Sequence, residues 1–153
     1  MPIKPRHFTL NVLLPIIAGG LIYLCWRDPK LLMFRWISAL GLQTVVGHLR
    51  LAVSVNPGTL PHWFLYTLPD GLWVYALTAF MGQIWRESVK TWPRLFWISL
   101  GLVIGAGSEL GQLAGVVPGT FDIFDLCFSV FAAVAAFLII SLKTKRSLNE
   151  STV

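Results

Sequence analysis

The sequence predicts an all-α protein, a polytopic transmembrane helix bundle of four or five spans that forms one domain over residues 1–153. Hydrophobic residues make up 56% of the chain and charged residues only 12%, with a mean hydropathy of +0.71. A soluble domain carries about 25% charged residues, so too little polar surface remains here to cover a water-facing globule. The apolar residues also come in long runs. In lipid such runs form helices, because every backbone polar group must be satisfied within its own segment.

Five apolar stretches are candidates for spans, which need about 20 residues each. They cover about 9–26, 31–47, 66–85, 95–115 and 124–142. The first is expected to be a retained helix, because no small-residue cleavage site follows it. The second is marginal and carries Arg35 near its start, so it is either a span or a re-entrant or surface helix. Five spans are favoured, because every apolar stretch is then used.

Basic residues in the short loops set the expected orientation, because positive loops resist translocation. The loop between the third and fourth spans and the C-terminal tail carry three such residues each: Arg86, Lys90, Arg94, Lys143, Lys145 and Arg146. The loop GVVPGTFD at residues 115–122 carries none. The C-terminus is therefore expected in the cytoplasm and this loop outside. With five spans, Arg27 lies at the inner surface; with four, Lys4 and Arg6 lie inside.

Four of the seven acidic residues lie in the apolar spans or at their ends: Asp70, Glu109, Asp122 and Asp125. A charged group at the centre of a span costs at least about 2.5 kcal/mol, so such residues are usually functional or paired. Glu109 shares a helix face with Gln112, three residues on. This pair either serves a function, or bonds a neighbouring helix or a buried arginine.

Asp122 and Asp125 open the last span, where a capping box is the alternative to a functional role. The last two spans form a hairpin, so Glu109, Gln112, Asp122 and Asp125 are expected to converge on one outward-facing polar pocket. Such a pocket suits a cation, a metal or a polar lipid headgroup. Asp70, which also reads as a helix cap, and His62 are weaker candidates for the same pocket.

Gly107, Gly111 and Gly115 repeat every four residues in the fourth span and predict a flat helix-packing face. Cys25 and Cys127 are expected to be buried packing thiols, since they show neither a disulfide framework nor a zinc-ligand spacing. No metal site and no cofactor is predicted. The basic residues form no continuous stripe, which argues against nucleic acid as a partner. No nucleophile signature is present, so catalytic residues are unknown and a non-enzymatic role is favoured.

The segment Glu109-Leu110-Gly111-Gln112, then Pro118-Gly119, then Asp122 to Asp125 resembles the VanZ-like family of small bacterial membrane proteins. That family shows E-x-x-Q, a P-G-R loop and D-x-x-D at the next helix start. Here Gly119 or Thr120 stands in place of the arginine, and Ser129 in place of a following asparagine. The resemblance covers about 25 residues. It implies a location in the bacterial inner membrane and a cell-envelope role, with teicoplanin-type glycopeptide resistance as the namesake.

Three functions fit these observations. The first is a non-enzymatic envelope protein whose acidic pocket recognises a membrane lipid headgroup, a lipid-linked cell-wall intermediate or a cation. The second is a structural or accessory subunit, with a membrane-protein partner or a second copy of the chain packed on the glycine face. The third is a metal-assisted enzyme acting on lipid, with Glu109 and Asp125 as acid, base or ligands.

Overall fold

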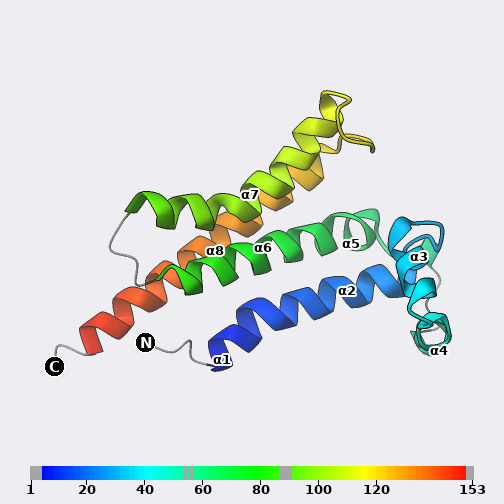
Figure 1. The fold of residues 1–153 in the computed structure, drawn as a ribbon, viewed down its shortest axis with the longest axis horizontal. Coiled ribbons are helices and arrows are strands. Elements are labelled where there is room, and N and C mark those ends of the chain that lie inside the picture. Colours follow the sequence, from blue (N-terminus) through cyan, green and yellow to red (C-terminus); the bar gives the residue numbers. More distant parts are fainter. Residues whose placement is uncertain (1–4, 54, 56, 87–90, 151–153) are drawn as a thin grey trace.

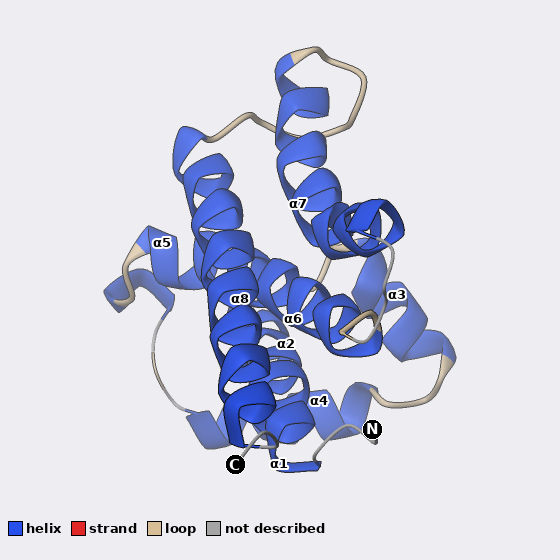
Figure 2. Ribbon diagram, turned by 90° about the vertical axis from the view of Figure 1, so that its left-hand side faces the viewer, coloured by secondary structure: helices blue, strands red, loops and turns tan. Residues whose placement is uncertain are grey.

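The structure, a computed structural model, describes residues 5–53, 55, 57–86 and 91–150, and only the backbone of residues 57 and 142–150. Its elements, shown in Figure 1, are α1 (Pro5–Phe8), η1 (Thr9–Leu13), α2 (Leu14–Trp26), α3 (Leu32–Ala39), α4 (Gln43–Val53), η2 (Pro57–Thr59), α5 (His62–Leu65), α6 (Thr67–Ile84), α7 (Thr91–Leu113) and α8 (Ile123–Glu150). The described residues contain no strand (Figure 2). The all-α prediction is confirmed.

Three segments are long and apolar enough to cross a membrane: Pro5–Trp26, Thr91–Leu113 and Ile123–Ser141. The first stays helical although Pro15 lies inside it. Proline has no N–H, and its ring crowds the carbonyl four residues earlier in an α-helix. That carbonyl belongs to Asn11, which lies in the π-helical turn η1. Asn11 in this turn is buried, accepts a bond from the Tyr75 hydroxyl at 2.9 Å and donates to the His7 carbonyl at 2.8 Å.

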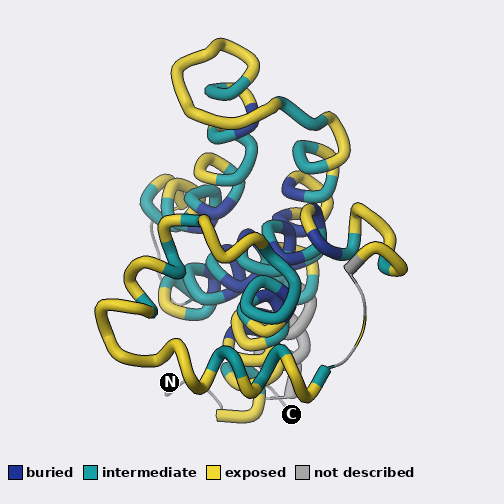
Figure 3. The backbone as a smooth tube through the Cα atoms, turned by 90° about the vertical axis from the view of Figure 1, so that its right-hand side faces the viewer, coloured by how far each residue is buried: buried dark blue, intermediate teal, exposed yellow. Residues whose placement is uncertain are grey.

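Helix α6 lies at the centre of the bundle and contacts α2, α7 and α8. Its buried positions are mostly small residues, which let neighbouring helices approach closely; they are Thr67, Pro69, Gly71, Val74, Ala76, Thr78, Ala79 and Gly82. Alanines of α8 pack against this face. The buried backbone accordingly gathers in the middle of the molecule, while α3, α4 and the 114–120 loop are largely exposed (Figure 3).

The close approach of α7 to α6 and α8 depends on Gly101 and Gly105, which lie outside the expected series of Gly107, Gly111 and Gly115. A Cβ at Gly101 would lie 2.8 Å from the Val74 carbonyl oxygen, and one at Gly105 would lie 3.0 Å from Ser129 Oγ. The same four-residue register continues to Glu109. Because residues four apart share a helix face, Glu109 is directed towards the interior of the bundle rather than towards lipid.

The glycines expected to form a packing face are placed differently. Nothing described lies within 4 Å of a Cβ built at Gly107. Gly111 packs against Val117 of the following loop, and Gly115 lies beyond the end of α7 with φ +69°. Within this chain, therefore, the described helices pack on Gly101 and Gly105 instead.

The marginal second stretch does not form one long helix. Residues 31–47 divide between α3 and α4, with a turn at residues 40–42 where Gly41 has φ +71°. The eight residues of α3 extend only about 12 Å, far less than the roughly 30 Å of hydrocarbon core. The preference for five spans is therefore not confirmed. Both helices lie at one end of the bundle, beside the end of α2 (Figure 1).

The two ends of the bundle differ in what they carry. The starts of α1 and α7 and the ends of α6 and α8 lie at one end, and α3, α5 and the loop from α7 to α8 lie at the other (Figure 1). We call the end with α3 and α5 the loop end, and the opposite one the terminal end.

Both cysteines are free, and Cys127, expected to be buried, is exposed on the surface of α8.

Candidate functional site

Glu109 is the most deeply buried carboxylate among the described residues, with 7% of its surface exposed. It reaches from α7 across to the segment that precedes α8. Its Oε2 accepts the backbone N–H of Asp122 at 3.1 Å. A buried carboxylate requires such a donor, because an unsatisfied charge in a low-dielectric interior is costly. Glu109 is therefore held in place by the backbone of the next helix.

Asp122 is the N-cap of α8, which begins at Ile123. Its Oδ1 accepts the N–H of Phe124 at 2.8 Å, as a capping aspartate does. In a capping box the N3 residue, Asp125, would accept the N–H of Asp122. That N–H is bonded to Glu109 instead. Asp125 therefore does not make the capping-box bond. Its Oδ1 is buried and has no hydrogen-bond partner in the described part of the chain.

Asp70 joins these carboxylates from the central helix. It is the fourth residue of α6, and no hydrogen bond to the helix start involves it among the described residues. Its carboxylate interacts electrostatically with Arg27, Asp125 and Glu109. Acidic side chains from three helices, α6, α7 and α8, therefore lie near enough for Glu109 and Asp125 to act electrostatically on Asp70, and the Arg27 guanidinium acts on Asp70 with the opposite sign.

That guanidinium belongs to Arg27, the residue that follows α2. Its Cζ lies 4.5 Å from the centre of the Tyr66 ring and 5.0 Å from that of Tyr23. Its Nε is buried without a hydrogen-bond partner in the described residues. With five spans Arg27 would lie at the opposite surface from Asp70, whereas in the structure both lie at one end of the bundle, because α2 ends where α6 begins (Figure 1).

A cavity of about 630 Å³ opens beside this cluster, between the α5–α6 junction and the start of α8. It is lined by His62, Trp63, Thr67, Asp122, Phe124 and Phe128. Asp70 lies three residues beyond Thr67 on α6, and Asp125 lies three residues beyond Asp122. Residues three apart share a helix face, so these two carboxylates lie one helical turn deeper than the cavity lining.

His62 and Gln112 take positions at the edge of this arrangement. The His62 ring lines the cavity and stacks on Tyr66 with 4.2 Å between ring centres. Gln112 packs against the loop, since a Cβ at Gly119 would lie 2.7 Å from its Cδ. Gly119 has φ +142°, a conformation that favours glycine. Gln112 thus supports the turn after α7, and its side chain makes no hydrogen bond among the described residues.

The carboxylates of the cluster are suited to bind a positively charged group. Asp70 interacts electrostatically with two carboxylates, Glu109 and Asp125, and with one guanidinium, that of Arg27, so acceptor oxygens outnumber cationic groups, and no direct ion pair joins Arg27 to a described carboxylate. The described residues contain no group of three His, Cys, Asp or Glu side chains placed to hold a metal ion. An ammonium group that enters from the cavity would find hydrogen-bond acceptors and opposite charge.

Sequence reasoning missed Arg27, Tyr66 and Thr67 as parts of this site. One signal was available for Thr67, which precedes Asp70 by three residues and therefore shares its helix face. Ser129, noted only for its place after Asp125, is buried with 3% of its surface exposed and packs beside Gly105. No protein-family model matches the chain, and no similar curated protein or solved structure was found.

Proposed function

We propose that this chain is a small bacterial cell-envelope protein of VanZ-like type, which crosses the cytoplasmic membrane four times and binds the headgroup of a membrane lipid in an outward-facing acidic pocket. The observation that carries the proposal is the electrostatic interaction of Asp70 with Glu109 and Asp125 beside the cavity. These side chains come from three helices, and the Arg27 guanidinium also acts on Asp70.

Four crossings fit the helix lengths and the charges. The three long apolar segments and α6, which they surround, would cross, while α3 and α4 would lie at the outer surface. An even number of crossings agrees with the start of α1 and the end of α8, which lie at the same end of the bundle (Figure 1). Eight of the twelve Lys and Arg residues belong to the segments nearest that end: Lys4, Arg6, Arg86, Lys90, Arg94, Lys143, Lys145 and Arg146. The positive-inside rule then directs the cavity outward.

The ligand best suited to the pocket is a lipid headgroup with a protonated amine. The cavity lining combines aromatic side chains with Asp122 and His62, so it offers both apolar contact and polar anchors. The amine would pass below the lining to Asp70 and Asp125. A lipid-linked cell-wall intermediate with a free amine has the same chemistry, and a simple cation lacks the apolar part.

Arg27 offers a substitute for a residue that the VanZ-like resemblance leaves missing. The family pattern places an arginine in the loop where this chain has Gly119 or Thr120. Arg27 approaches the carboxylates from α2 instead. It would limit the repulsion among the three acidic groups in the absence of ligand, and a bound amine would complete the neutralisation.

Headgroup binding is tested with purified protein in nanodiscs of phosphatidylcholine that contain phosphatidylethanolamine. The wild type is expected to retain the amine-bearing lipid selectively, and Asp125→Asn to lose that selectivity. Asp28→Asn is the matched control, because Asp28 is an exposed carboxylate at the same end. Equal retention of both lipids by the wild type would refute headgroup recognition.

The envelope role is tested separately in the host bacterium. Deletion of the gene is expected to raise sensitivity to teicoplanin-type glycopeptides or to membrane-active agents. Complementation with Asp125→Asn should fail at unchanged protein level, and complementation with Asp28→Asn should succeed. No change in sensitivity across the panel would contradict the envelope role, whatever the lipid selectivity.

A role as accessory subunit is the second candidate, favoured by the open surface at Gly107. A Cβ there meets nothing within 4 Å, so a helix of another membrane protein would be able to approach closely. Native purification would then yield a complex that Gly107→Leu disrupts. Recovery of a monomer whose behaviour Gly107→Leu leaves unchanged would remove this candidate.

A further inference from the structure

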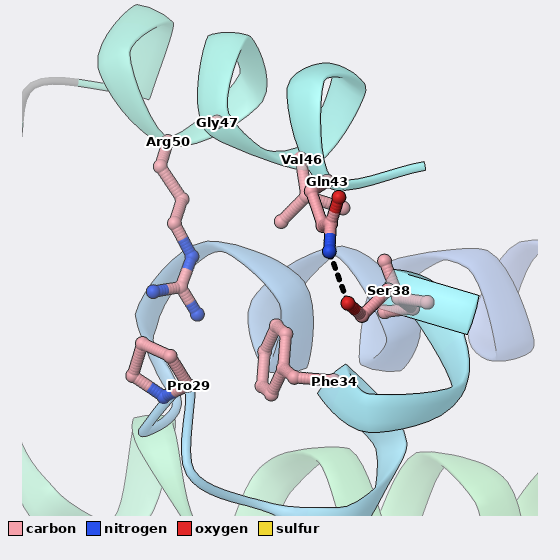
Figure 4. Close-up of a pocket in the computed structure, with 8 residues that line it drawn as sticks. Pro29, Phe34, Ser38, Gln43, Val46, Gly47 and Arg50 are labelled. Atoms are coloured by element: carbon pink, nitrogen blue, oxygen red, sulfur yellow. Dashed lines mark hydrogen bonds between the residues drawn. The ribbon is translucent and has the colours of Figure 1, made fainter. Parts of the chain in front are cut away.

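A second cavity lies between α3 and α4, apart from the acidic site, and has a volume of about 330 Å³. Its lining consists of Pro29, Phe34, Ile37, Ser38, Gln43, Val46, Gly47 and Arg50 (Figure 4). This volume lies at the lower end of the range for small-molecule sites, about 300–1,000 Å³. The cavity contains one charged side chain, that of Arg50.

Arg50 is held in a fixed position by three contacts. Its Nε donates to the Leu24 carbonyl at 2.8 Å and its Nη2 donates to the Arg27 carbonyl at 2.7 Å. These carbonyls belong to the C-terminal end of α2, where cations are favourable. The Arg50 Cζ also lies 4.8 Å from the centre of the Phe34 ring. The guanidinium is therefore oriented before any ligand arrives.

These contacts leave part of the guanidinium unused. Its third nitrogen, Nη1, forms no hydrogen bond, and no carboxylate pairs with Arg50, within the part of the chain that the structure describes. Both bonded partners are neutral carbonyl groups. A guanidinium with neutral partners in an apolar-lined pocket attracts an anion strongly, and its geometry suits the oxygens of a phosphate.

The polar groups on the other side of Phe34 are also hydrogen-bond donors. The Gln43 amide nitrogen donates to the Ser38 hydroxyl oxygen (Figure 4). Because this oxygen is already an acceptor, the hydroxyl hydrogen of Ser38 remains free to donate. The second amide hydrogen of Gln43 likewise has no acceptor among the described residues. The lining thus offers donors from Ser38, Gln43 and Arg50 to an oxygen-rich group.

The surroundings indicate a lipid as the source of that group. Residues 27–50 contain four basic residues, Arg27, Lys30, Arg35 and Arg50, against one acidic residue, Asp28. Loop charges alone would place such residues at the cytoplasmic side, yet they lie at the loop end. These two helices and the turn between them expose large apolar side chains, among them Trp36, Leu40 and Leu51, the last two at 72% and 75% exposure.

We propose that the pocket between α3 and α4 binds the phosphate of an anionic membrane lipid. Arg50 Nη1 contacts a phosphate oxygen, and Ser38 and Gln43 donate to oxygens of the adjoining glycerol. The acyl chains of that lipid lie along the exposed apolar side chains of α3 and α4. The site takes a negatively charged group, so it differs in ligand chemistry from the acidic pocket and does not depend on it.

Native mass spectrometry of purified protein tests this site, with equal amounts of phosphatidylglycerol and phosphatidylcholine present in the micelles. A charge-assisted contact predicts at least about tenfold preference of the wild type for phosphatidylglycerol. Arg50→Gln should abolish the preference and Arg50→Lys should keep part of it. Ser38→Ala should weaken it several-fold while the bonds from Arg50 to α2 remain. Arg94→Gln, at the terminal end, should leave it unchanged.

Ser38→Ala keeps the proposal testable if Arg50→Gln does not fold, since it leaves the end of α2 untouched. Lipid preference that is absent in the wild type, or that is unchanged in Ser38→Ala and Arg50→Gln, would overturn the proposal. Excess inorganic phosphate distinguishes the source of the phosphate. Retention of phosphatidylglycerol in its presence supports a lipid, and displacement by it shows that free phosphate is the ligand instead.

Discussion

The Glu109 carboxylate accepts the backbone N–H of Asp122 at 3.1 Å and thereby fastens α7 to the start of α8. This bond closes the loop of residues 114–121 by joining groups thirteen residues apart. It also replaces the bond that Asp125 would make in a capping box. Asp125 Oδ1 is left without a hydrogen-bond partner in the described part of the chain, and the Asp125 carboxylate acts electrostatically on Asp70.

The first prediction concerns the stability that this bond provides. Glu109→Ala leaves the Asp122 N–H without its acceptor and should lower the free energy of unfolding by about 1–3 kcal/mol. Glu109→Gln keeps an acceptor oxygen and should cost clearly less. Unfolding in detergent with increasing denaturant measures both. Asp28→Ala serves as an exposed comparison, because it also removes a carboxylate acceptor, that of the Lys30 N–H at 2.9 Å, but at a position where water can replace it. Equal losses for Ala and Gln would show that charge, not the hydrogen bond to Asp122, decides the stability.

The second prediction compares glycines on two faces of α7. Gly105→Ala places a Cβ 3.0 Å from Ser129 Oγ and should destabilise the protein by about 1–3 kcal/mol, as overpacking does. Gly107→Ala meets open space and should be neutral, or stabilising by up to about 1 kcal/mol through helix propensity. Thermal unfolding of the two variants in the same detergent measures the difference. Destabilisation by Gly107→Ala alone would contradict the packing described.

The sequence predicted the helical bundle and its longest helices, because long apolar runs allow few other structures. It did not predict how residues 31–47 divide. Their composition fits a short span, but the turn at Gly41 interrupts the helix. It also did not predict that α7 packs on α6 and α8 through Gly101 and Gly105. Two glycine series run along α7, and only the tertiary contacts of Val74 and Ser129 distinguish them.

The candidate site was predictable where residues are close along the chain. The hairpin of α7 and α8 brought Glu109 and Asp122 together as expected. Arg27 was not predictable in the same way, since its neighbours Tyr66 and Asp70 are about forty residues away. Its position depends on the direction of α2, which follows from the number of crossings. Five crossings would place Arg27 and Asp70 on opposite surfaces, whereas four crossings place them on the same one.

The third prediction concerns the buried bond between Asn11 and Tyr75. Tyr75→Phe removes the hydroxyl that donates to Asn11 Oδ1 at 2.9 Å. Hydrogen bonds between membrane helices contribute about 0.6 kcal/mol on average and up to about 1.7, so a loss within this range is expected. Tyr23→Phe is the control, because the Tyr23 hydroxyl has no partner among the described residues. A larger loss for Tyr23→Phe would contradict this assignment.

The last prediction concerns topology and decides between four and five crossings. Single cysteines are introduced after Cys25 and Cys127 have been replaced by serine, and intact cells are treated with a membrane-impermeant maleimide. A cysteine at Thr120 should react, because the loop of residues 115–122 carries no Lys or Arg and is expected outside. A cysteine at Thr91, the first residue of α7, should react only after permeabilisation. A cysteine at Ser88, in the connection before α7, is expected to react in the same way as one at Thr91. Ser88 itself lies outside the described residues.

Lys30 separates the two topologies. It lies between α2 and α3, at the loop end, and is exposed. With four crossings a cysteine at Lys30 reacts from outside, as one at Thr120 does. With five crossings it is protected until the membrane is permeabilised. Because Arg27 interacts with Asp70 in the folded chain, we expect reaction from outside. Protection of Lys30→Cys together with reaction of Thr120→Cys would place Arg27 and Asp70 on opposite surfaces, and the acidic pocket would then lack its guanidinium.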